Sequence, residues 1–254
     1  MQSAGNDIIA LDLTDKQRSN DSRFYSKILS ESEKKYYCHS PLAGMEFEYF
    51  LWLCWSVKES AYKYLKRIQP GLIFSPTRIE IVHVAIPVNG KFEQPECIQW
   101  EGPAQGEKCY NGRFVFEGNT YYFRSKIYPG MITTVVNADE SFEHVSWGFD
   151  SIDDTGSEHQ SKAVRAFLLQ KLQTILPGKE LRIEKAAAGY PVVFSGTEEL
   201  DIPVSFAHHG SYIAYSFYLP DYRCSEDEEL FSLFHYTRDW KSRKEDLYHP
   251  ISTL

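Results

Sequence analysis

The sequence lacks an excess of basic residues. It carries 27 Lys and Arg against 35 Asp and Glu, which gives a formal net charge of −8 at pH 7. Proteins that bind nucleic acid through electrostatic attraction need a strongly basic surface. We therefore expect no nucleic-acid partner, and any other acidic partner would require a local basic patch.

Cysteine is scarce and has no pattern. The chain has five cysteines, an odd number, scattered without a CxxC motif or the Cys/His spacing of a metal site: Cys38, Cys54, Cys97, Cys109 and Cys224. This usage is typical of reduced thiols in a cytosolic protein. We therefore expect a cytoplasmic location.

Long hydrophobic runs are also absent. No apolar segment approaches the length that crosses a membrane, and the N-terminal MQSAGNDIIALDL has no basic stretch followed by a long apolar one. We expect neither secretion nor membrane insertion. The sequence has no detectable repeat, and its 43% hydrophobic and 15% aromatic residues can fill the core of one large or two small domains.

The first half of the chain predicts helices followed by a sheet. A strand is expected over residues 7–13, and Ser30 with Glu33 predicts the capping box of a first helix. The periodicity of residues 47–66 predicts a long amphipathic helix. β-Branched and aromatic residues then alternate with polar ones across residues 75–137, which predicts an antiparallel sheet.

The second half repeats this order of elements. The acidic, turn-rich residues 150–160 are the expected linker, residues 161–176 a second helix, and strands follow it. We predict an α+β fold of two similar lobes, residues 1–150 and 160–254, each an antiparallel sheet packed with helices, with a cleft between them. The charged C-terminal end is expected to be a solvated helix or tail.

The long helix carries the stretch WSVKESAYK, residues 55–63. One side of the helix collects an expected core stripe: Phe47, Phe50, Cys54, Val57, Ala61 and Leu65. The opposite side collects charged and aromatic residues: Trp52, Ser56, Glu59, Lys63 and Lys66, with Trp55 close by. Glu59 and Lys63 are spaced as an ordinary surface pair, worth about 0.2–0.5 kcal/mol. Because a solvated face rarely carries two tryptophans, the alternative is a partly enclosed polar pocket that handles a metal and phosphate.

Three other stretches are candidates for chemistry. GND, residues 5–7, places Asp7 in an otherwise apolar strand, as either an exposed strand-end carboxylate or a functional one. AAAGYP, residues 186–191, is either a simple turn or part of a site. SFAHHG, residues 205–210, ends a strand with two histidines that alternation sends to opposite faces, so that one is structural if the other lines a cleft.

Together these stretches resemble the 4′-phosphopantetheinyl transferase superfamily. Residues 55–63 are similar to its signature W-S-x-K-E-S/A-x-x-K at every specified position. GND is similar to the family's G-x-D, GYP to its G-K-P, and SFAHHG to its S-x-S-H. Residues 23–33 resemble the region between the aspartate and the signature helix, so the resemblance covers most of the chain.

The order of the motifs resembles that of the short holo-acyl-carrier-protein synthase type, which forms trimers with sites between chains. In the longer surfactin-synthetase-activator type, the lobe with G-K-P and S-H comes first. Because this chain has two lobe-sized halves, we expect a monomeric pseudodimer with the lobes in reversed order and the site at their interface. The alternative is a short-type subunit with a large sheet insertion.

Four positions depart from the family pattern: Tyr190 replaces the lysine of G-K-P, Ala207 replaces the serine before the histidine, and Ile9 and Ala10 stand where members often carry a second acidic residue. Metal binding would then rest on Asp7 and Glu59 with water. Mg²⁺ suits such a site, because it keeps several waters and typically takes one or two carboxylates plus substrate phosphates.

The resemblance implies a transferase that moves 4′-phosphopantetheine from coenzyme A to a serine of an apo acyl, peptidyl or aryl carrier protein, with release of adenosine 3′,5′-bisphosphate. Such enzymes serve fatty acid or polyketide biosynthesis, and the sequence leaves the carrier and the pathway open. The alternative is a catalytically inactive homologue that binds a carrier protein or a nucleotide as a scaffold.

The resemblance also implies roles for individual residues. Asp7 and Glu59 would hold Mg²⁺ against the pyrophosphate, and Glu59 and Lys63 would be catalytic, Lys63 by binding a phosphate oxygen. Either Glu59 or a metal-bound water would accept the serine proton, and the sequence does not decide between them. Contacts with coenzyme A are implied for Lys58, Lys63, Arg165, Tyr190 and His208, with Arg165 and His208 on the 3′-phosphate or adenosine side.

Overall fold

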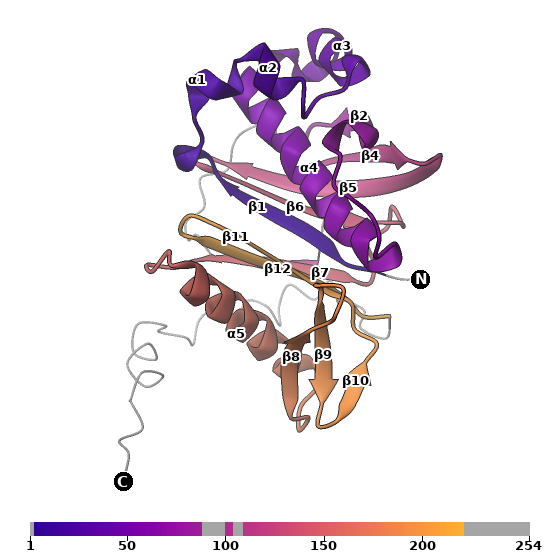
Figure 1. The fold of residues 1–254 in the computed structure, drawn as a ribbon, viewed down its shortest axis with the longest axis vertical. Coiled ribbons are helices and arrows are strands. Elements are labelled where there is room, and N and C mark those ends of the chain that lie inside the picture. Colours follow the sequence, from indigo (N-terminus) through magenta and orange to yellow (C-terminus); the bar gives the residue numbers. More distant parts are fainter. Residues whose placement is uncertain (1–2, 88–99, 104–108, 221–254) are drawn as a thin grey trace. The chain divides into compact units, whose positions relative to one another are not determined.

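The computed structural model describes residues 3–87, 100–103 and 109–220, which all belong to one compact unit, Met1–Arg223 (Figure 1). The mixture of helices and antiparallel sheets confirms the predicted α+β class. Cys97, Cys224 and the charged C-terminal end, for which a solvated helix or tail was expected, lie outside the described residues.

A five-stranded antiparallel sheet comes from the first half of the chain, in the order β1-β6-β5-β4-β2. Its strands are β1 (Gly5–Ala10), β2 (Glu80–Ala85), β4 (Tyr110–Phe116), β5 (Asn119–Tyr128) and β6 (Met131–Asn137). The antiparallel sheet predicted here is confirmed. The first strand is also confirmed, but it ends earlier than expected because Leu11–Leu13 forms a 3-10 helix.

Four α-helices accompany this sheet in the described residues: α1 (Lys16–Ser19), α2 (Ser22–Tyr25), α3 (Glu31–His39) and α4 (Phe47–Ile68). Short 3-10 helices at Pro41–Gly44 and Pro76–Arg78 flank α4. The capping box of α3 is confirmed, since the Ser30 N–H donates to Glu33 Oε2 (2.7 Å) and the Glu33 N–H to Ser30 Oγ (3.2 Å). The long helix predicted over residues 47–66 is confirmed as α4.

α4 packs closely on one face of this sheet, against β1 and β6. Gly5 permits the close approach, because a Cβ at this position would lie 2.2 Å from the carbonyl oxygen of Ser60. Alternation along β1 turns Asp7 and Ile9 toward α4, whereas Ile8 faces the other way. The glycine of GND therefore allows the strand to bring Asp7 against α4.

A four-stranded sheet has the order β11-β12-β7-β3, and a three-stranded sheet has the order β10-β9-β8. β11, β12 and the three-stranded sheet come from the second half, whereas β3 and most of β7 come from residues 1–150. The strands are β3 (Trp100–Pro103), β7 (Val145–Ser151), β8 (Leu181–Lys185), β9 (Pro191–Ser195), β10 (Glu198–Leu200), β11 (Val204–His209) and β12 (Tyr212–Tyr218). The predicted second helix is confirmed as α5 (Ser157–Ile175), which packs on β8, β11 and β12.

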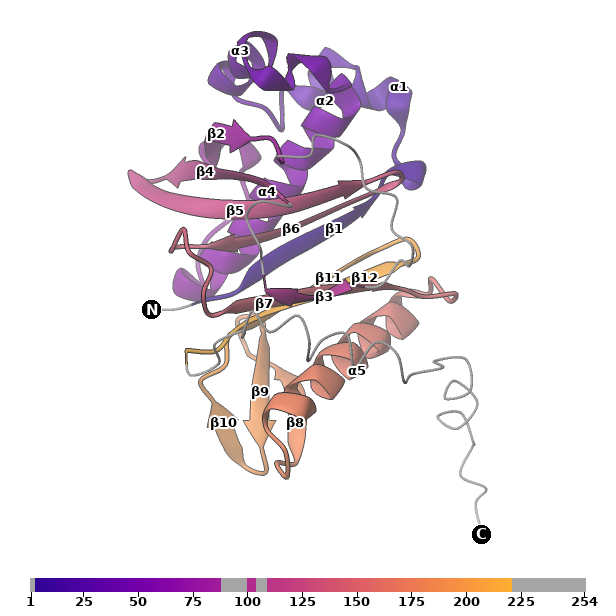
Figure 2. The same cartoon turned by 180° about the vertical axis from the view of Figure 1, so that it is seen from behind.

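The two larger sheets are adjacent, with β1 next to β11 and β12 in both views (Figures 1 and 2). Side chains join β1 to β11, since the Asn6 N–H donates to Ser205 Oγ (3.2 Å) and the Ala10 N–H to His209 Nδ1 (3.1 Å). Ile8 is among the apolar residues buried between the sheets. This junction brings the strand of Asp7 beside the strand of the two histidines.

The two larger sheets share one feature of connectivity. β1 pairs with β6 and β7 pairs with β12, so that in each of these sheets an earlier strand pairs with a later one and a long helix lies between them in sequence. Two similar lobes would produce this pattern. The sheets differ in strand number, and β7 belongs to the second sheet although it ends at the predicted boundary, so the division at residues 150–160 and the pseudodimer stay predictions.

Candidate active site

α4 is covered on both of its sides. The predicted core stripe is confirmed for Phe50, Cys54, Val57, Ala61 and Leu65, each at most 1% exposed, while Phe47 is partly buried. The opposite, polar side is not a solvated face either, because none of its predicted members is exposed. The choice between a surface ion pair and an enclosed polar pocket therefore depends on what covers that side.

The tryptophans of the polar side pack against other elements. Trp55 and Tyr62 both contact Phe74, with ring centroids 5.6 and 5.0 Å apart. Trp52 lies edge-on to Trp55 at 6.4 Å, and its indole N–H donates to Ser19 Oγ (3.1 Å). The loop after α4 and helix α1 thus cover this part of the helix, and the tryptophans have a structural role.

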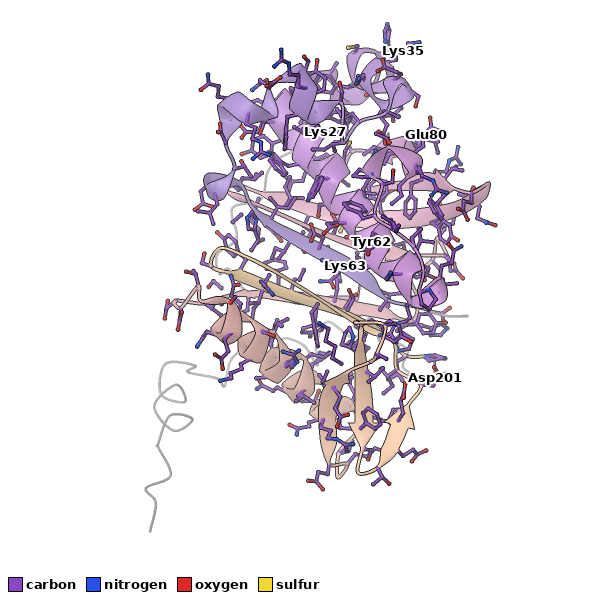
Figure 3. All side chains as sticks on the ribbon, viewed as in Figure 1. Lys27, Lys35, Tyr62, Lys63, Glu80 and Asp201 are labelled. Atoms are coloured by element: carbon purple, nitrogen blue, oxygen red, sulfur yellow. The ribbon has the colours of Figure 1, made fainter. Side chains whose placement is uncertain are left out.

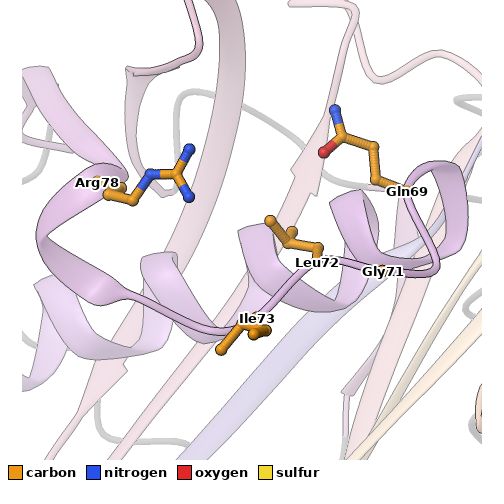
Figure 4. Close-up of a pocket in the computed structure, with 5 residues that line it drawn as sticks. All are labelled: Gln69, Gly71, Leu72, Ile73 and Arg78. Atoms are coloured by element: carbon orange, nitrogen blue, oxygen red, sulfur yellow. The ribbon is translucent and has the colours of Figure 1, made fainter.

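The loop after α4 also forms a pocket (Figure 4). Its volume is about 380 Å³, and its lining comprises Gln69, Gly71, Leu72, Ile73 and Arg78. These residues are not among those predicted for the site, so the pocket gives no support to any of the predicted roles.

Asp7 and Glu59 approach each other from β1 and α4, with Lys63 beside them. Lys63 Nζ donates to Asp7 Oδ1 and to the Asn6 carbonyl oxygen, both at 3.0 Å, and Figure 3 shows Lys63 on the side of α4 that faces β1. The Asp7 side chain is 10% exposed and that of Lys63 27%. Asp7 Oδ2 and Glu59 Oε2 are buried and have no hydrogen-bond partner among the described residues.

Both carboxylates have a raised pKa, and the charge of Asp7 contributes to the rise at Glu59. Burial raises the pKa of Asp7, and the charge and hydrogen bond of Lys63 partly oppose this rise. Burial also raises the pKa of Glu59, Lys63 lowers it, and the negative charge of Asp7 raises it further. A divalent cation would relieve both the repulsion between the carboxylates and the lack of partners for their oxygens. The geometry thus shows a buried cluster of charged groups and not an exposed surface ion pair.

Lys58 has a different position from the one expected for a coenzyme A contact. Its side chain is fully buried, and Nζ donates to Glu33 Oε2 (2.6 Å) and to the Ile28 carbonyl oxygen (2.7 Å). Glu33 also accepts from the Ile81 N–H at 2.8 Å, so the pair links α3, α4 and β2. An enclosed and already bonded ammonium has no surface for a phosphate, which corrects the predicted contact.

His208 lies on β11 and Arg165 on α5, both in the second half of the chain. Desolvation lowers the pKa of His208, and the positive charges of Lys63, His209 and Arg165 lower it further. Arg165, on α5, donates to the Ser161 carbonyl oxygen at 2.9 Å. His208 is exposed, whereas His209 accepts from the Ala10 N–H, which fits the expectation that one histidine is structural. His208 therefore lies in a positive environment to which Lys63 and Arg165 both contribute.

Tyr190 contacts an arginine that the sequence did not suggest as a site residue. The Arg67 guanidinium lies 4.4 Å from the centre of the Tyr190 ring and donates to the carbonyl oxygens of Pro191 (2.5 Å) and Val204 (3.0 Å). Arg67 thereby ties the end of α4 to β9 and β11. The only signal in the sequence was its position one helical turn after Lys63, on the same side of the helix.

The structure therefore brings Asp7, Glu59 and Lys63 into one cluster, and it places His208 where the charges of both Lys63 and Arg165 lower its pKa. Within the described ranges, no group of three or more His, Cys, Asp or Glu side chains is placed to hold a metal ion. A cation at Asp7 and Glu59 would need further oxygen ligands. None of the described helices is both long and apolar enough to span a membrane.

Comparison with known protein families gives a match to the first part of the chain. Residues 3–106 match the model of the 4′-phosphopantetheinyl transferase superfamily, and this range includes Asp7, Glu59 and Lys63. Arg165, Tyr190 and His208 lie outside the matched range, which covers less than half of the 254 residues. No curated protein and no solved structure matches the chain significantly. The match supports transfer of phosphopantetheine in general, a reaction for which the superfamily uses coenzyme A and typically Mg²⁺.

Proposed function

We propose that this protein transfers 4′-phosphopantetheine from coenzyme A to a serine hydroxyl of an apo acyl or peptidyl carrier protein. The products are the holo carrier protein and adenosine 3′,5′-bisphosphate. The observation that carries the proposal is the cluster of Asp7, Glu59 and Lys63. It lies within the range that matches the superfamily, and two of its buried carboxylate oxygens have no partner among the described residues.

The residues of the cluster fit a magnesium ion. Asp7 and Glu59 offer oxygen ligands, and Mg²⁺ prefers oxygen and commonly takes one or two carboxylates with waters and phosphates. When bound, Mg²⁺ would neutralise negative charge on the pyrophosphate of coenzyme A. The unpartnered Asp7 Oδ2 and Glu59 Oε2 are the atoms with free capacity for it.

Other side chains bind and orient the donor. Lys63 Nζ holds a phosphate oxygen, and its present bond to Asp7 keeps it at the edge of the cluster. The serine oxygen attacks the phosphorus, the bond from that phosphorus to the bisphosphate breaks, and the serine proton goes to Glu59 or to a water beside it. His208 and Arg165 bind the 3′-phosphate.

Mass spectrometry of an apo carrier protein incubated with coenzyme A, Mg²⁺ and the enzyme tests the proposal. We expect the carrier to gain the mass of one phosphopantetheine. Carrier binding without this gain, across several acyl and peptidyl carriers, would instead support the inactive scaffold. We further propose a cytoplasmic enzyme that uses no nucleic-acid or membrane partner.

We expect the enzyme to be a monomer in solution, with both halves of one chain contributing to the site. Lys63 lies on α4 of the first half, while His208 and Arg165 come from β11 and α5 of the second. Light scattering coupled to gel filtration should therefore give a mass near 29.4 kDa. A stable trimer would favour the short-type alternative with sites between chains.

Recognition of the 3′-phosphate should depend on His208 and Arg165. Replacing either by alanine should raise KM for coenzyme A about tenfold while changing KM for the carrier little, because one charge-assisted contact contributes roughly 1.5 kcal/mol. Dephospho-coenzyme A should be a poor donor for the wild type and lose little more in either variant. Equal use of both donors by the wild type would remove these residues from the site.

A further inference from the structure

Ser56 is the third polar residue that α4 directs at Asp7. It lies three residues before Glu59 and seven before Lys63, so all three share one side of the helix. The side chain is completely buried, and its hydroxyl oxygen makes no hydrogen bond to any described residue. It interacts with the Asp7 carboxylate, more weakly than in a normal hydrogen bond, and this interaction lowers the pKa of Asp7.

An unpartnered buried hydroxyl destabilises a fold unless something else uses it. Ser60, one turn further along the same helix, is equally buried, and its hydroxyl donates to the Thr134 carbonyl oxygen at 3.3 Å. A purely structural serine on α4 thus has a partner. Ser56 and Glu59, each with an unpartnered oxygen, instead lie on the side of α4 from which Lys63 contacts Asp7, whose Oδ2 is also unpartnered among the described residues.

β1 contributes one carboxylate, that of Asp7, to the cluster with Glu59 and Ser56. Ile9 is the next residue of β1 on the Asp7 side, and it is 3% exposed within the apolar cluster under α4. Two carboxylates leave several positions of an octahedral Mg²⁺ for other oxygens. Serine and threonine hydroxyls are established Mg²⁺ ligands in phosphate-transferring enzymes of other folds.

We propose that the Ser56 hydroxyl is the third protein oxygen of the cation site, a neutral donor in the place of a second strand carboxylate. This inference rests on the proposed magnesium site at Asp7 and Glu59. A neutral oxygen attracts a cation less than a carboxylate does. The cation is therefore bound more weakly by the protein alone than it would be by three carboxylates, and the pyrophosphate supplies the remaining attraction.

Titration of the full-length protein with Mn²⁺, followed by electron paramagnetic resonance of the free ion, measures the site without turnover. We expect Ser56→Ala to weaken Mn²⁺ binding about tenfold or more, since loss of a group that supports a metal site typically costs 10–100-fold. The matched control is Ser60→Ala, which removes a buried hydroxyl from the same helix and should leave the affinity within about twofold of wild type.

In the cation-free protein, the two alanine variants should shift the melting temperature in different directions. Ser56→Ala removes an unsatisfied hydroxyl, so its melting temperature should be unchanged or roughly 2–4 °C higher. Ser60→Ala loses a hydrogen bond and should melt lower. Weaker Mn²⁺ binding together with a lower melting temperature in Ser56→Ala would indicate general damage to the fold and overturn the inference.

A sulfur at position 56 tests direct contact. Ser56→Cys should gain a tight Cd²⁺ site that Mn²⁺ competes for and that shows thiolate-to-cadmium absorption, because soft thiolates select Cd²⁺ over Mg²⁺. Ser60→Cys is the matched control, because it also adds one buried thiol to the five native cysteines, and it should not gain this Cd²⁺ site. If wild type binds Mn²⁺ and Ser56→Ala binds it equally well, this inference alone is overturned. If wild type binds no Mn²⁺, the cation site of the proposed function is overturned as well.

Discussion

Glu59→Gln and Asp7→Asn should each lower kcat/KM for transfer to the carrier protein by about a hundredfold or more. Each change keeps the shape of the side chain and removes one of the two charges that would hold the cation, and electrostatic stabilisation of this kind has no substitute within the cluster. Steady-state kinetics with an apo carrier protein measures the effect. Near-normal turnover in a folded variant would remove that residue from the site.

The matched control is Glu48→Gln, on the same helix. Glu48 accepts a hydrogen bond from Thr14 (3.2 Å) and lies 3.7 Å from Lys16, away from the carboxylate cluster. It should retain wild-type activity. A large loss in this variant would mean that removing any acidic residue from α4 impairs the enzyme, and the result for Glu59 would then carry no information about the site.

The stability of Glu59→Gln should depend on pH in a defined direction. Burial raises the pKa of Glu59 in the folded state, so its ionisation opposes folding once the pH passes the unfolded value near 4.3. The variant should therefore be at least as stable as wild type at pH 7, and the difference should vanish below about pH 4. Chemical denaturation at several pH values checks this, and a variant less stable at pH 7 than at pH 4, relative to wild type, would contradict it.

Local sequence signals predicted the elements that depend on neighbouring residues. The capping box of Ser30 and Glu33 and the period of α4 both involve positions within a few residues of each other, and both are confirmed. The environment of the polar side of α4 does not follow from local signals, because periodicity places Ser56, Glu59 and Lys63 together but says nothing about what covers them. Only the packing of β1 on α4 shows that Asp7 meets this side.

The roles of Lys58 and Arg67 depend on residues distant in the sequence. Lys58 pairs with Glu33, 25 positions away, and Arg67 reaches Pro191 and Val204 in the other half of the chain. No periodicity links such positions. The motif resemblance implies contacts with coenzyme A for both lysines of the signature. Their exposure differs, however, because Lys63 is partly exposed at the cluster and Lys58 is fully enclosed.

Lys58→Met should destabilise the folded protein by about 3–5 kcal/mol, because it leaves Glu33 as a buried charge without its partner. The pair is at most 1% exposed and Glu33 also accepts from the N–H groups of Ser30 and Ile81, so the loss would loosen α3 and β2 from α4. Urea denaturation measures the change. A lysine that served only coenzyme A would instead alter KM and leave the free energy of unfolding unchanged.

The double variant Lys58→Met with Glu33→Gln separates the charge effect from lost packing. Removing both partners leaves no unpaired ion, so the double variant should be less destabilised than the sum of the two single variants, by about 1–3 kcal/mol. Lys66→Met is a matched control, since Lys66 lies on the same helix, is partly exposed and donates only to the Leu72 carbonyl oxygen among its described contacts. Additive effects of Lys58 and Glu33, or a loss in Lys66→Met as large as in Lys58→Met, would show that the buried ion pair is not what holds α3 and β2 to the helix that carries Glu59 and Lys63.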